Sequence, residues 1–414
     1  MFFKAELAGL SYDIKILARG IRLTFGGYND KIKKFASFVS NKLFTRVQDL
    51  LPADDKDFDR YKDQIMRALS AFDVSQPYSH ASYYAQLTLQ PRRFQYSNKS
   101  LRDATRQITL PDLVAYSKSA WRKGKGICLV QGNFNEVEAL DLVQSIGDKI
   151  PFQPIREKDY PPRLVALHLP TTDSLTLPPR LLVTEPNPLN ENSACHVMVQ
   201  SLGTSNKDHV LIELLNTVLD EPFYSDLRTR QQLGYIVASG IKGVAETRTL
   251  SFIVQSSIAP SNALTLEILK FLDDVEPKIL EKIPKADITV YVKSLIEKKT
   301  NPDKDLYIEA SRNWSEISNG RLQFDRLQRE SAALLNIEKE DLLDFWRSIY
   351  VESSRRVLIT EIIPRKGEAS SPAPSTSSGY GRNDFPLSSF TLGLDDIDQF
   401  RRDRERRDDG VADL

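Results

Sequence analysis

The stretch Thr-Leu-Ser-Phe-Ile-Val-Gln-Ser-Ser at residues 249–257 decides the fold, because it has an earlier counterpart in the same chain. Its alternation of side chains is typical of a β-strand with one buried face. The stretch Gly-Ile-Arg-Leu-Thr-Phe-Gly-Gly-Tyr at residues 20–28 matches it 229 residues earlier. Two related strands at this separation indicate that a larger unit of the chain is duplicated.

Further segments recur at an offset of 229 or 230 residues. They are a helical face, an aromatic position, a capped helix and an apolar strand: residues 58–66 and 288–296, Tyr84 and Trp314, residues 108–116 and 337–345, and residues 126–132 and 356–362. The apolar spacing of the first pair marks one face of a helix, and Thr109 and Asn336 are typical residues for starting one. Several matches at one offset predict two tandem copies of one α+β unit.

The two copies differ at their start. Residues 177–186 and 194–202 add two predicted strands ahead of the second copy. The first copy opens instead with an expected helix over residues 4–12 and lacks such strands, which would leave a bare sheet edge. The expected domains are a first domain at 1–150 without its opening strands, a connector at 151–176, a second domain at 177–365 and a low-complexity charged tail at 366–414.

Composition changes in the connector region and in the tail. The proline-rich region before the second copy includes Arg-Leu-Val-Ala-Leu-His-Leu at 163–169, which predicts some sheet character. The Ser/Pro/Gly-rich residues 366–384 predict disorder. The mixed charges of residues 401–409 predict a solvated tail rather than a surface for nucleic acid.

Charge and cysteine usage limit the class of protein. Lys+Arg and Asp+Glu both number 56 in the 414 residues, so the formal net charge is zero and gives no general reason to expect nucleic acid or an acidic membrane surface as partner. Cys128 and Cys195 lie in apolar, strand-like runs. Two buried, reduced thiols indicate a cytoplasmic protein, and a mitochondrial or peroxisomal pool stays open. No apolar run is long enough for a membrane span.

The four histidines, His80, His168, His196 and His209, form neither an H-E-x-x-H nor an H-x-x-E-H motif. A zinc peptidase needs about three protein ligands and a general base, so no metal site is expected in this chain. His80 and His209 are instead expected at the surface or at an interface. Cys128 is expected to be buried and inert within its strand, and C-x-x-C pairs, serine nucleophile elbows and phosphate-binding loops are absent from the sequence.

One segment stands out as a candidate for catalytic chemistry. It runs from Glu221 to Tyr235 and reads Glu-Pro-Phe-Tyr-Ser-Asp-Leu-Arg-Thr-Arg-Gln-Gln-Leu-Gly-Tyr. On a continuous helix Arg228 and Tyr235 would share one face, and Gly234 would favour a helix end. A guanidinium and a phenol aimed at one point suit an oxyanion formed from a peptide carbonyl. Spacing alone favours a simpler interpretation, a core tyrosine and a surface arginine paired with Asp226 or Glu221.

Residues 227–240, Leu-Arg-Thr-Arg-Gln-Gln-Leu-Gly-Tyr-Ile-Val-Ala-Ser-Gly, strongly resemble the signature of the insulin-degrading enzyme branch of the pitrilysin metallopeptidases. Further motifs agree with that family in order and spacing: residues 5–13 with 27–30, 75–84, 129–134, and 313–317 with 324–326. The resemblance implies two tandem domains of the pitrilysin and mitochondrial-processing-peptidase type, each a mixed sheet covered by helices. They are similar to the third and fourth of the family's four domains.

The resemblance also implies roles for single residues. Arg228 and Tyr235 fall on family positions that hold the substrate and stabilise the tetrahedral oxyanion, and Tyr224 falls on an aromatic that lines the cleft. Tyr12 occupies the place of Tyr235 in the first copy, where a structural role is expected. In the family, zinc and the general base belong to the amino-terminal half, so this chain alone is expected to bind no zinc and to be inactive.

These observations favour the carboxyl-terminal half of a zinc metalloendopeptidase that degrades peptides in an enclosed chamber. Its expected partners are peptide substrates and an amino-terminal catalytic half or a full-length homologue. A homodimer stays open, and neither nucleic acid nor a membrane span is expected. The alternative is a non-catalytic scaffold or peptide-binding subunit of the same fold, and a third option is a degenerate product without a stable fold.

Overall fold

The computed structural model describes residues 2–17, 20–92, 94–150, 152–156, 158, 160, 166–172, 178–244, 247–351, 355–365, 391–393 and 396–411. The chain forms two compact units. Unit 1 comprises residues 1–70, 96–163 and 303–321, and unit 2 comprises residues 71–95, 164–302 and 322–414. Among the helices in these ranges, none has the length and apolar character needed to cross a membrane.

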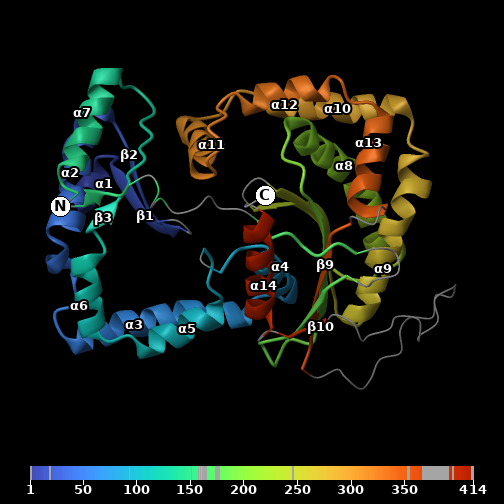
Figure 1. The fold of residues 1–414 in the computed structure, drawn as a ribbon, viewed down its shortest axis with the longest axis horizontal. Coiled ribbons are helices and arrows are strands. Elements are labelled where there is room, and N and C mark those ends of the chain that lie inside the picture. Colours follow the sequence, from blue (N-terminus) through green and yellow to red (C-terminus); the bar gives the residue numbers. More distant parts are fainter. Residues whose placement is uncertain are drawn as a thin grey trace. The chain divides into compact units, whose positions relative to one another are not determined.

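Unit 1 contains a two-stranded antiparallel sheet and several helices (Figure 1). In this sheet β1 (Ser11–Leu17) pairs with β2 (Gly20–Gly26), and a short parallel pair joins β3 (Lys123–Gly124) to β4 (Gln153–Pro154). Its helices are α1 (Phe2–Leu7), α2 (Asn29–Ser40), α3 (Asp55–Ser70), α5 (Asn98–Gln107), α6 (Leu110–Ser119), α7 (Glu136–Gly147) and α11 (Leu306–Ser318). Two short helical turns, Asn41–Thr45 and Val47–Leu50, follow α2.

A small core joins α2 to the hairpin of unit 1. Its buried residues are Leu10, Ile32, Phe35 and Val39. The Phe35 ring lies edge-on to Tyr12 in β1, with 6.1 Å between ring centroids. Tyr12 therefore packs against α2, although 43% of its surface stays exposed.

Unit 2 is built on a six-stranded mixed sheet with the strand order β10-β5-β9-β6-β8-β7. The strands are β5 (Arg180–Thr184), β6 (Ser193–Ser201), β7 (Ile236–Val244), β8 (Thr247–Ser256), β9 (Val357–Ile363) and β10 (Thr391–Leu392). β5 runs parallel to β9 and β10, while β6 is antiparallel to both β9 and β8. All residues of β6 are buried, because strands flank it on two sides and helices cover both sheet faces.

Helices cover the two faces of this sheet in separate layers (Figure 1). The main core forms between the sheet and α8 (Asn206–Tyr224), α9 (Ser261–Asp274), α10 (Lys285–Thr300), α12 (Arg326–Leu334) and α13 (Lys339–Trp346). On the other face lie α4 (Pro77–Thr88) and α14 (Ile397–Val411). The small side chains Ala81 and Ala85 are fully buried, which lets α4 approach the sheet closely. Shorter helical turns are Ala71–Val74, Ser225–Arg230, Val275–Leu280 and Arg347–Val351.

Helices recur at the offset that the sequence predicts, so α3 matches α10, α4 matches α11 and α6 matches α13. One matched pair is exchanged between the units. Helix α4 belongs to the first copy in sequence but packs within unit 2, whereas α11 belongs to the second copy and packs within unit 1. The compact units therefore follow contacts, while the predicted boundaries at 150, 176 and 365 follow the sequence repeat and stay a prediction.

The strands of the two copies met the predictions unequally. The strands predicted at 177–186 and 194–202 are confirmed as β5 and β6. The strand predicted at 126–132 is wrong, and Cys128 is exposed rather than buried. A strand needs a hydrogen-bonded neighbour, and no described strand pairs with these residues.

Two further expectations fail at the starts of the two copies. The helix expected over residues 4–12 ends at Leu7, because Gly9 adopts a φ of 74° and turns the chain into β1. Residues 166–169, part of the predicted sheet segment at 163–169, form no strand.

The tail is more ordered at its end than its charges predict. β10 extends the sheet at β5, and α14 contributes Ile397 and Phe400 to the core beside α4. The Arg401 side chain is fully buried and donates from Nε to the Gln90 carbonyl at 2.8 Å. The prediction of a solvated tail at 401–409 is thus wrong for Arg401, because its guanidinium caps backbone carbonyls. Residues 366–384 lie outside the described residues.

Candidate functional site

The segment with Arg228 and Tyr235 connects α8 to β7. Helix α8 passes into a wider π-helical turn at Ser225–Arg230, and the chain then turns sharply at Gln232, whose φ is 55°. The prediction that Arg228 and Tyr235 share a continuous helix is therefore wrong. The helix ends before Gly234, and Tyr235 stands just ahead of the first residue of β7.

Two leucines and a glycine hold this turn in place. Leu227 is fully buried and Leu233 nearly so, and the Leu233 N–H donates to the Leu227 carbonyl at 3.0 Å. A Cβ at Gly234 would lie 1.9 Å from the Gln255 carbonyl oxygen in β8. Only glycine allows so close an approach, so the turn that presents Tyr235 is fixed against the sheet.

The turn brings the two predicted residues together despite the break in the helix. The Arg228 guanidinium carbon lies 5.2 Å from the centre of the Tyr235 ring, within the range of a cation–π contact. Tyr235 is 83% exposed and Tyr224, at the end of α8, is 49% exposed. The phenol is thus not a core group, and its hydroxyl can reach a ligand outside the fold.

The Asp226 carboxylate pairs with Arg230 and not with Arg228. Arg230 donates from Nε to Asp226 at 2.9 Å, as an i, i+4 pair. Within the described ranges, Arg228 forms no ion pair with Asp226 or Glu221. The simpler interpretation of a core tyrosine and a paired arginine therefore fails, and the site offers a cation and a phenol with donors to spare.

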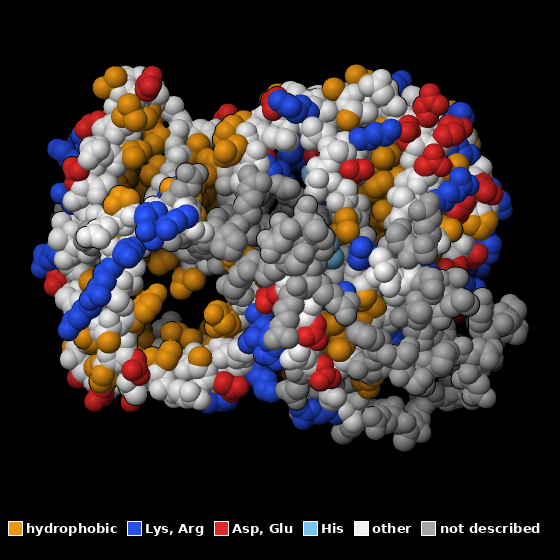
Figure 2. Space-filling view, in the orientation of Figure 1, with side chains coloured by type: hydrophobic (Ala, Val, Ile, Leu, Met, Phe, Trp, Pro, Cys, Tyr) orange, Lys and Arg blue, Asp and Glu red, His pale blue; other side chains and the backbone are white. Residues whose placement is uncertain are grey.

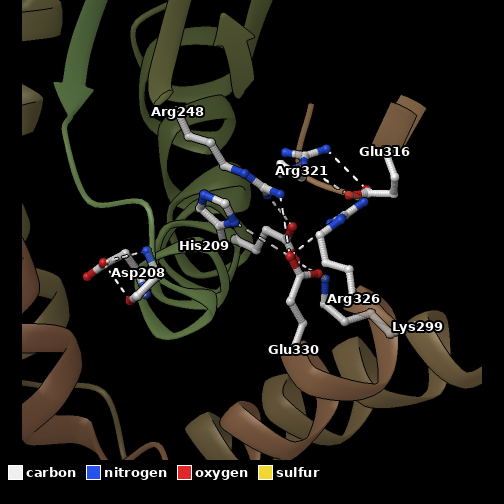
Figure 3. Close-up of polar contacts among 10 residues, drawn as sticks. Asp208, His209, Arg248, Lys299, Glu316, Arg321, Arg326 and Glu330 are labelled. Carbon is white, nitrogen blue, oxygen red and sulfur yellow. Dashed lines mark hydrogen bonds and ion pairs between the residues drawn. The ribbon is translucent and has the colours of Figure 1, made fainter. Parts of the chain in front are cut away.

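A cluster of ionic side chains fixes the other end of α8 (Figure 3). This α8 ion cluster centres on Glu330 of α12, which is fully buried. Lys299 of α10 donates to Glu330 at 2.7 Å and Arg326 donates at 2.8 Å. Glu213 of α8 accepts from Lys299 at 2.5 Å and also pairs with Arg248 of β8. The cluster ties α8 to three neighbouring elements, so the helix that carries Tyr224 is held rigidly.

The negative charge of Glu330 is stabilised by the side chains close to it. Burial alone would raise the pKa of Glu330, but His209 and Lys299 outweigh it and hold that pKa well below its ordinary value of 4.5. The carboxylate therefore stays ionised. We assign the cluster a structural task, because its carboxylates are saturated by protein donors and leave no open position for a ligand.

The histidines do not gather into a metal site. His80 lies between Glu185, at 3.2 Å from Nδ1, and the Phe72 carbonyl, at 2.7 Å from Nε2. His196 contacts Ser251 at 2.7 Å, and burial lowers the pKa of His196 to about 3. The expectation of surface positions is wrong for His80 and His209, because both are buried with acidic neighbours.

Across the described ranges, no three His, Cys, Asp or Glu side chains are grouped to hold a metal ion. The donor set of the described residues therefore offers no cluster that fits zinc, and none of them is assigned a metal-dependent step.

Comparisons with known proteins relate this chain to peptidase M16 proteins. Residues 1–101 match the middle or third domain of peptidase M16, and residues 214–314 match domain 4 of the C-terminal lobe of PqqF-like PQQ synthase proteins. The chain is 29% identical to human insulin-degrading enzyme over 357 residues, which cover 86% of this chain and 34% of the relative. It is 27% identical to the Drosophila melanogaster enzyme over 377 residues, covering 88% and 36%. This chain belongs to the insulin-degrading enzyme branch of the M16 (pitrilysin) family.

Solved structures of M16 proteins share the fold. The crystal structure of pitrilysin aligns with a TM-score of 0.75 at 16% identity, covering 96% of this chain and 39% of that one. An M16 inactive domain from Pseudomonas fluorescens aligns with a TM-score of 0.60 at 12% identity, covering 89% and 83%. The predicted α+β fold of the M16 family is confirmed. The chain spans only about a third of the length of its insulin-degrading relatives.

Sequence reasoning found the M16 segment but missed what supports it. Gln232 and the saturated Glu330 carry no local motif, and their roles depend on contacts between distant elements. The sequence suggests a helix end at Gly234, whereas the structure requires glycine there because the backbone approaches β8 closely. The pair that joins α10 to α8, Lys299 with Glu213, links residues far apart in the sequence, so no local spacing marks it.

Proposed function

We propose that this chain is the carboxyl-terminal, substrate-contacting half of a zinc metalloendopeptidase that degrades peptides in an enclosed chamber. The observation that carries the proposal is the contact of the Arg228 guanidinium, which has no carboxylate partner among the described residues, with the exposed Tyr235 phenol. Zinc and the general base would come from an amino-terminal half, as in the family. The family resemblance implies that Tyr224 contacts the substrate, and its exposure at the end of α8 supports that role.

The chemistry assigned to this chain is electrostatic. Attack of water on a peptide carbonyl places negative charge on the carbonyl oxygen, and Arg228 and Tyr235 can each donate a hydrogen bond to that oxygen. Tyr224 would contact a substrate side chain through its ring. The saturated α8 ion cluster and the fixed turn at Gly234 keep these donors in place, so little reorganisation would be needed on binding.

The test combines the full chain with the part of human insulin-degrading enzyme that precedes the region aligned with it. Neither component alone should cleave a fluorogenic peptide, and the mixture should. In the mixture, Arg228→Ala and Tyr235→Phe should each lower kcat by about 10²-fold to 10³-fold, the usual cost of one oxyanion donor. Arg230→Ala is the matched control, because Arg230 lies in the same turn but is paired with Asp226. Normal turnover in both site variants would remove the assigned roles.

The alternative is a peptide-binding or scaffold subunit of the same fold. It is favoured by the structural similarity to the inactive M16 domain from Pseudomonas fluorescens. Isothermal titration of a peptide with this chain separates the two. Binding that depends on Tyr224 and Tyr235, without hydrolysis in any mixture, would favour the scaffold.

A further inference from the structure

Gln255 of β8 lies where the sheet of unit 2 meets the turn that presents Tyr235. It pairs with Ile236, the first residue of β7, and the ladder between β7 and β8 begins at this pair. Its carbonyl oxygen is the atom that a Cβ at Gly234 would meet at 1.9 Å. The backbone of Gln255 is therefore the surface against which the turn before Tyr235 packs.

The side chain of Gln255 holds the start of helix α4. Its Oε1 atom accepts from the Tyr78 N–H at 3.0 Å, and its Nε2 atom donates to Oε1 of Gln76 at 3.2 Å. Side chains alternate between the two faces of a strand, and Phe252 and Val254 of β8 belong to the main core. Gln255 thus points to the opposite face of the sheet, where α4 lies.

These two hydrogen bonds take the place of an ordinary helix cap. Gln76 is the N-cap residue of α4, but its side chain makes no capping bond to the helix. Pro77 at the first position has no N–H, so the first N–H of the helix that needs an acceptor belongs to Tyr78. Gln255 supplies that acceptor from the sheet. One side chain therefore joins the first turn of α4 to the end of β8.

Helix α4 is itself fixed within unit 2. Ala81 and Ala85 are fully buried beneath it, and His80 lies between the Glu185 carboxylate at 3.2 Å and the Phe72 carbonyl at 2.7 Å. The ends of strands fray more readily than their centres. A bond from the end of β8 to so firmly held a helix therefore restrains that end.

The residue after Gln255 is also restrained, but only locally. The Ser256 hydroxyl accepts from the N–H groups of Ile258 at 3.0 Å and Ala259 at 2.9 Å. The Cα atom of Ser256 would lie 3.3 Å from a Cβ at Gly234. The bonds of Ser256 stay within its own turn, whereas those of Gln255 reach another helix. Of these two neighbours, Gln255 ties the turn to a second layer of the fold.

We propose that Gln255 is a positioning residue for Tyr235. By capping α4 from β8, its side chain fixes the strand end that supports the turn, and so fixes the place of the phenol hydroxyl. The inference rests on the proposed function for the reaction that this hydroxyl serves. A donor to an oxyanion must stand where the charge develops, so its displacement weakens the transition state more than it weakens substrate binding. Loss of the Gln255 bonds should therefore lower kcat and leave KM nearly unchanged.

Two variants of similar size separate the hydrogen bonds of Gln255 from its volume. Gln255→Leu removes both bonds and leaves the Tyr78 N–H without this acceptor. Gln255→Glu keeps an oxygen there and places a carboxylate at a helix N-terminus, which is favourable. In the mixture that tests the proposed function, Gln255→Leu should lower kcat about tenfold, whereas Gln255→Glu should stay within about twofold of the unchanged chain.

A double variant shows whether Gln255 acts through Tyr235. Tyr235→Phe removes the hydroxyl that Gln255 positions, so adding Gln255→Leu to it should lower kcat by less than about twofold further. A further loss of the full tenfold would give Gln255 a general structural role and overturn the inference. Ile253→Val, two residues earlier on the same face of β8, is the control for packing and should leave kcat unchanged.

Hydrogen exchange of this chain alone separates the inference from the proposed function. Gln255→Leu should speed exchange of the backbone amides at 233–236 by about tenfold, and Gln255→Glu should not. Figure 2 shows acidic and basic side chains interspersed over α10 and α13, where Lys285 pairs with Glu340 at 3.0 Å. Lys285→Ala removes this exposed pair and is the control that should leave exchange at 233–236 unchanged.

The outcomes divide as follows between the two claims. Unchanged exchange at 233–236 in Gln255→Leu overturns the inference, whatever the mixture does. Faster exchange without hydrolysis by the unchanged chain in the mixture supports the hold of Gln255 on the turn and counts against the proposed function. Hydrolysis with faster exchange but an unchanged kcat in Gln255→Leu supports the enzyme half and overturns the positioning role.

Discussion

The two copies contain the same kind of apolar run but treat it differently. Residues 356–362 form the central strand β9, whereas residues 126–132 stay outside any strand and leave Cys128 exposed. The sequences are similarly apolar, so propensity does not explain the difference. The neighbours do, because β9 lies between β5 and β6, whereas among the described residues no strand pairs with residues 126–132. A strand in the middle of a sheet is thus a property of three segments together.

The largest expected effect is at the polar position of this run, which is Glu361 in the second copy and Gln131 in the first. Glu361 is buried in an ion pair with Arg180, whereas the amide nitrogen of its counterpart Gln131 has no hydrogen-bond partner among the described residues. Glu361→Ala should lower the free energy of unfolding of unit 2 by about 3–5 kcal/mol, because it leaves the buried Arg180 guanidinium without its carboxylate partner. Gln131→Ala should cost about 1 kcal/mol or less. Urea unfolding followed by circular dichroism measures both, and equal losses would contradict the contrast.

A somewhat smaller effect is expected at the neighbouring apolar position. Leu358→Ala should cost about 3 kcal/mol, since it opens a cavity beside α4 and α14. Its counterpart Cys128 is exposed, so Cys128→Ala should change the free energy of unfolding by less than about 0.5 kcal/mol. Thermal unfolding of the two variants tests this, and equal losses would contradict the contrast.

A third contrast sets α4 against its counterpart α11. Burial alone would lower the pKa of His80, but its hydrogen bonds to Glu185 and to the Phe72 carbonyl prevail and raise that pKa above 6.5. Because the folded-state pKa is raised, this contribution is fully present below pH 6.5 and is lost as pH rises through the folded-state pKa. His80→Ala should therefore cost about 1–2 kcal/mol more at pH 6 than at pH 9.

The matched control for this pH effect is Ala310→Gly on α11, where the sequence places an alanine instead of a histidine. Its cost of about 1 kcal/mol comes from helix propensity and should not change with pH. Chemical denaturation at both pH values provides the measurement. A pH-independent cost for His80→Ala would rule out the ion pair with Glu185.

The smallest effect sharpens the comparison of the two equivalent tyrosines. Tyr12 packs on Phe35, so Tyr12→Ala should cost about 1 kcal/mol of unfolding free energy. Tyr235 is 83% exposed, and Tyr235→Ala should change stability by less than about 0.5 kcal/mol. Differential scanning calorimetry distinguishes these values. A large loss at Tyr235 would give that residue a structural task instead of a role at the substrate.

The sequence predicts what is encoded locally. Apolar periodicity and capping residues predicted the matched helices, and alternation predicted β5 and β6 ahead of the second copy. The resemblance located Arg228 and Tyr235. In the structure the Arg228 guanidinium carbon lies 5.2 Å from the centre of the Tyr235 ring, through a π-helical turn that no local pattern predicted.

The remaining features depend on distant segments. Whether residues 126–132 form a strand depends on partners that the segment does not contain. The burial of His80 depends on Glu185, which lies about a hundred residues along the chain. The burial of Arg401 depends in the same way on carbonyls at Gln90 and Gln95.

The exchange of α4 and α11 has a consequence for the order in which the protein can assemble on the ribosome. Translation of helix α4 is complete when Thr88 has been added. Part of its docking surface, β9, is complete only when Ile363 has been added. Unit 1 must likewise wait for α11, which ends at Ser318. The first copy therefore cannot complete its fold until α11 of the second copy has been translated, and α4 cannot dock fully until β9 has been. A protease cut in the connector would leave each half with a helix whose docking surface is on the other piece.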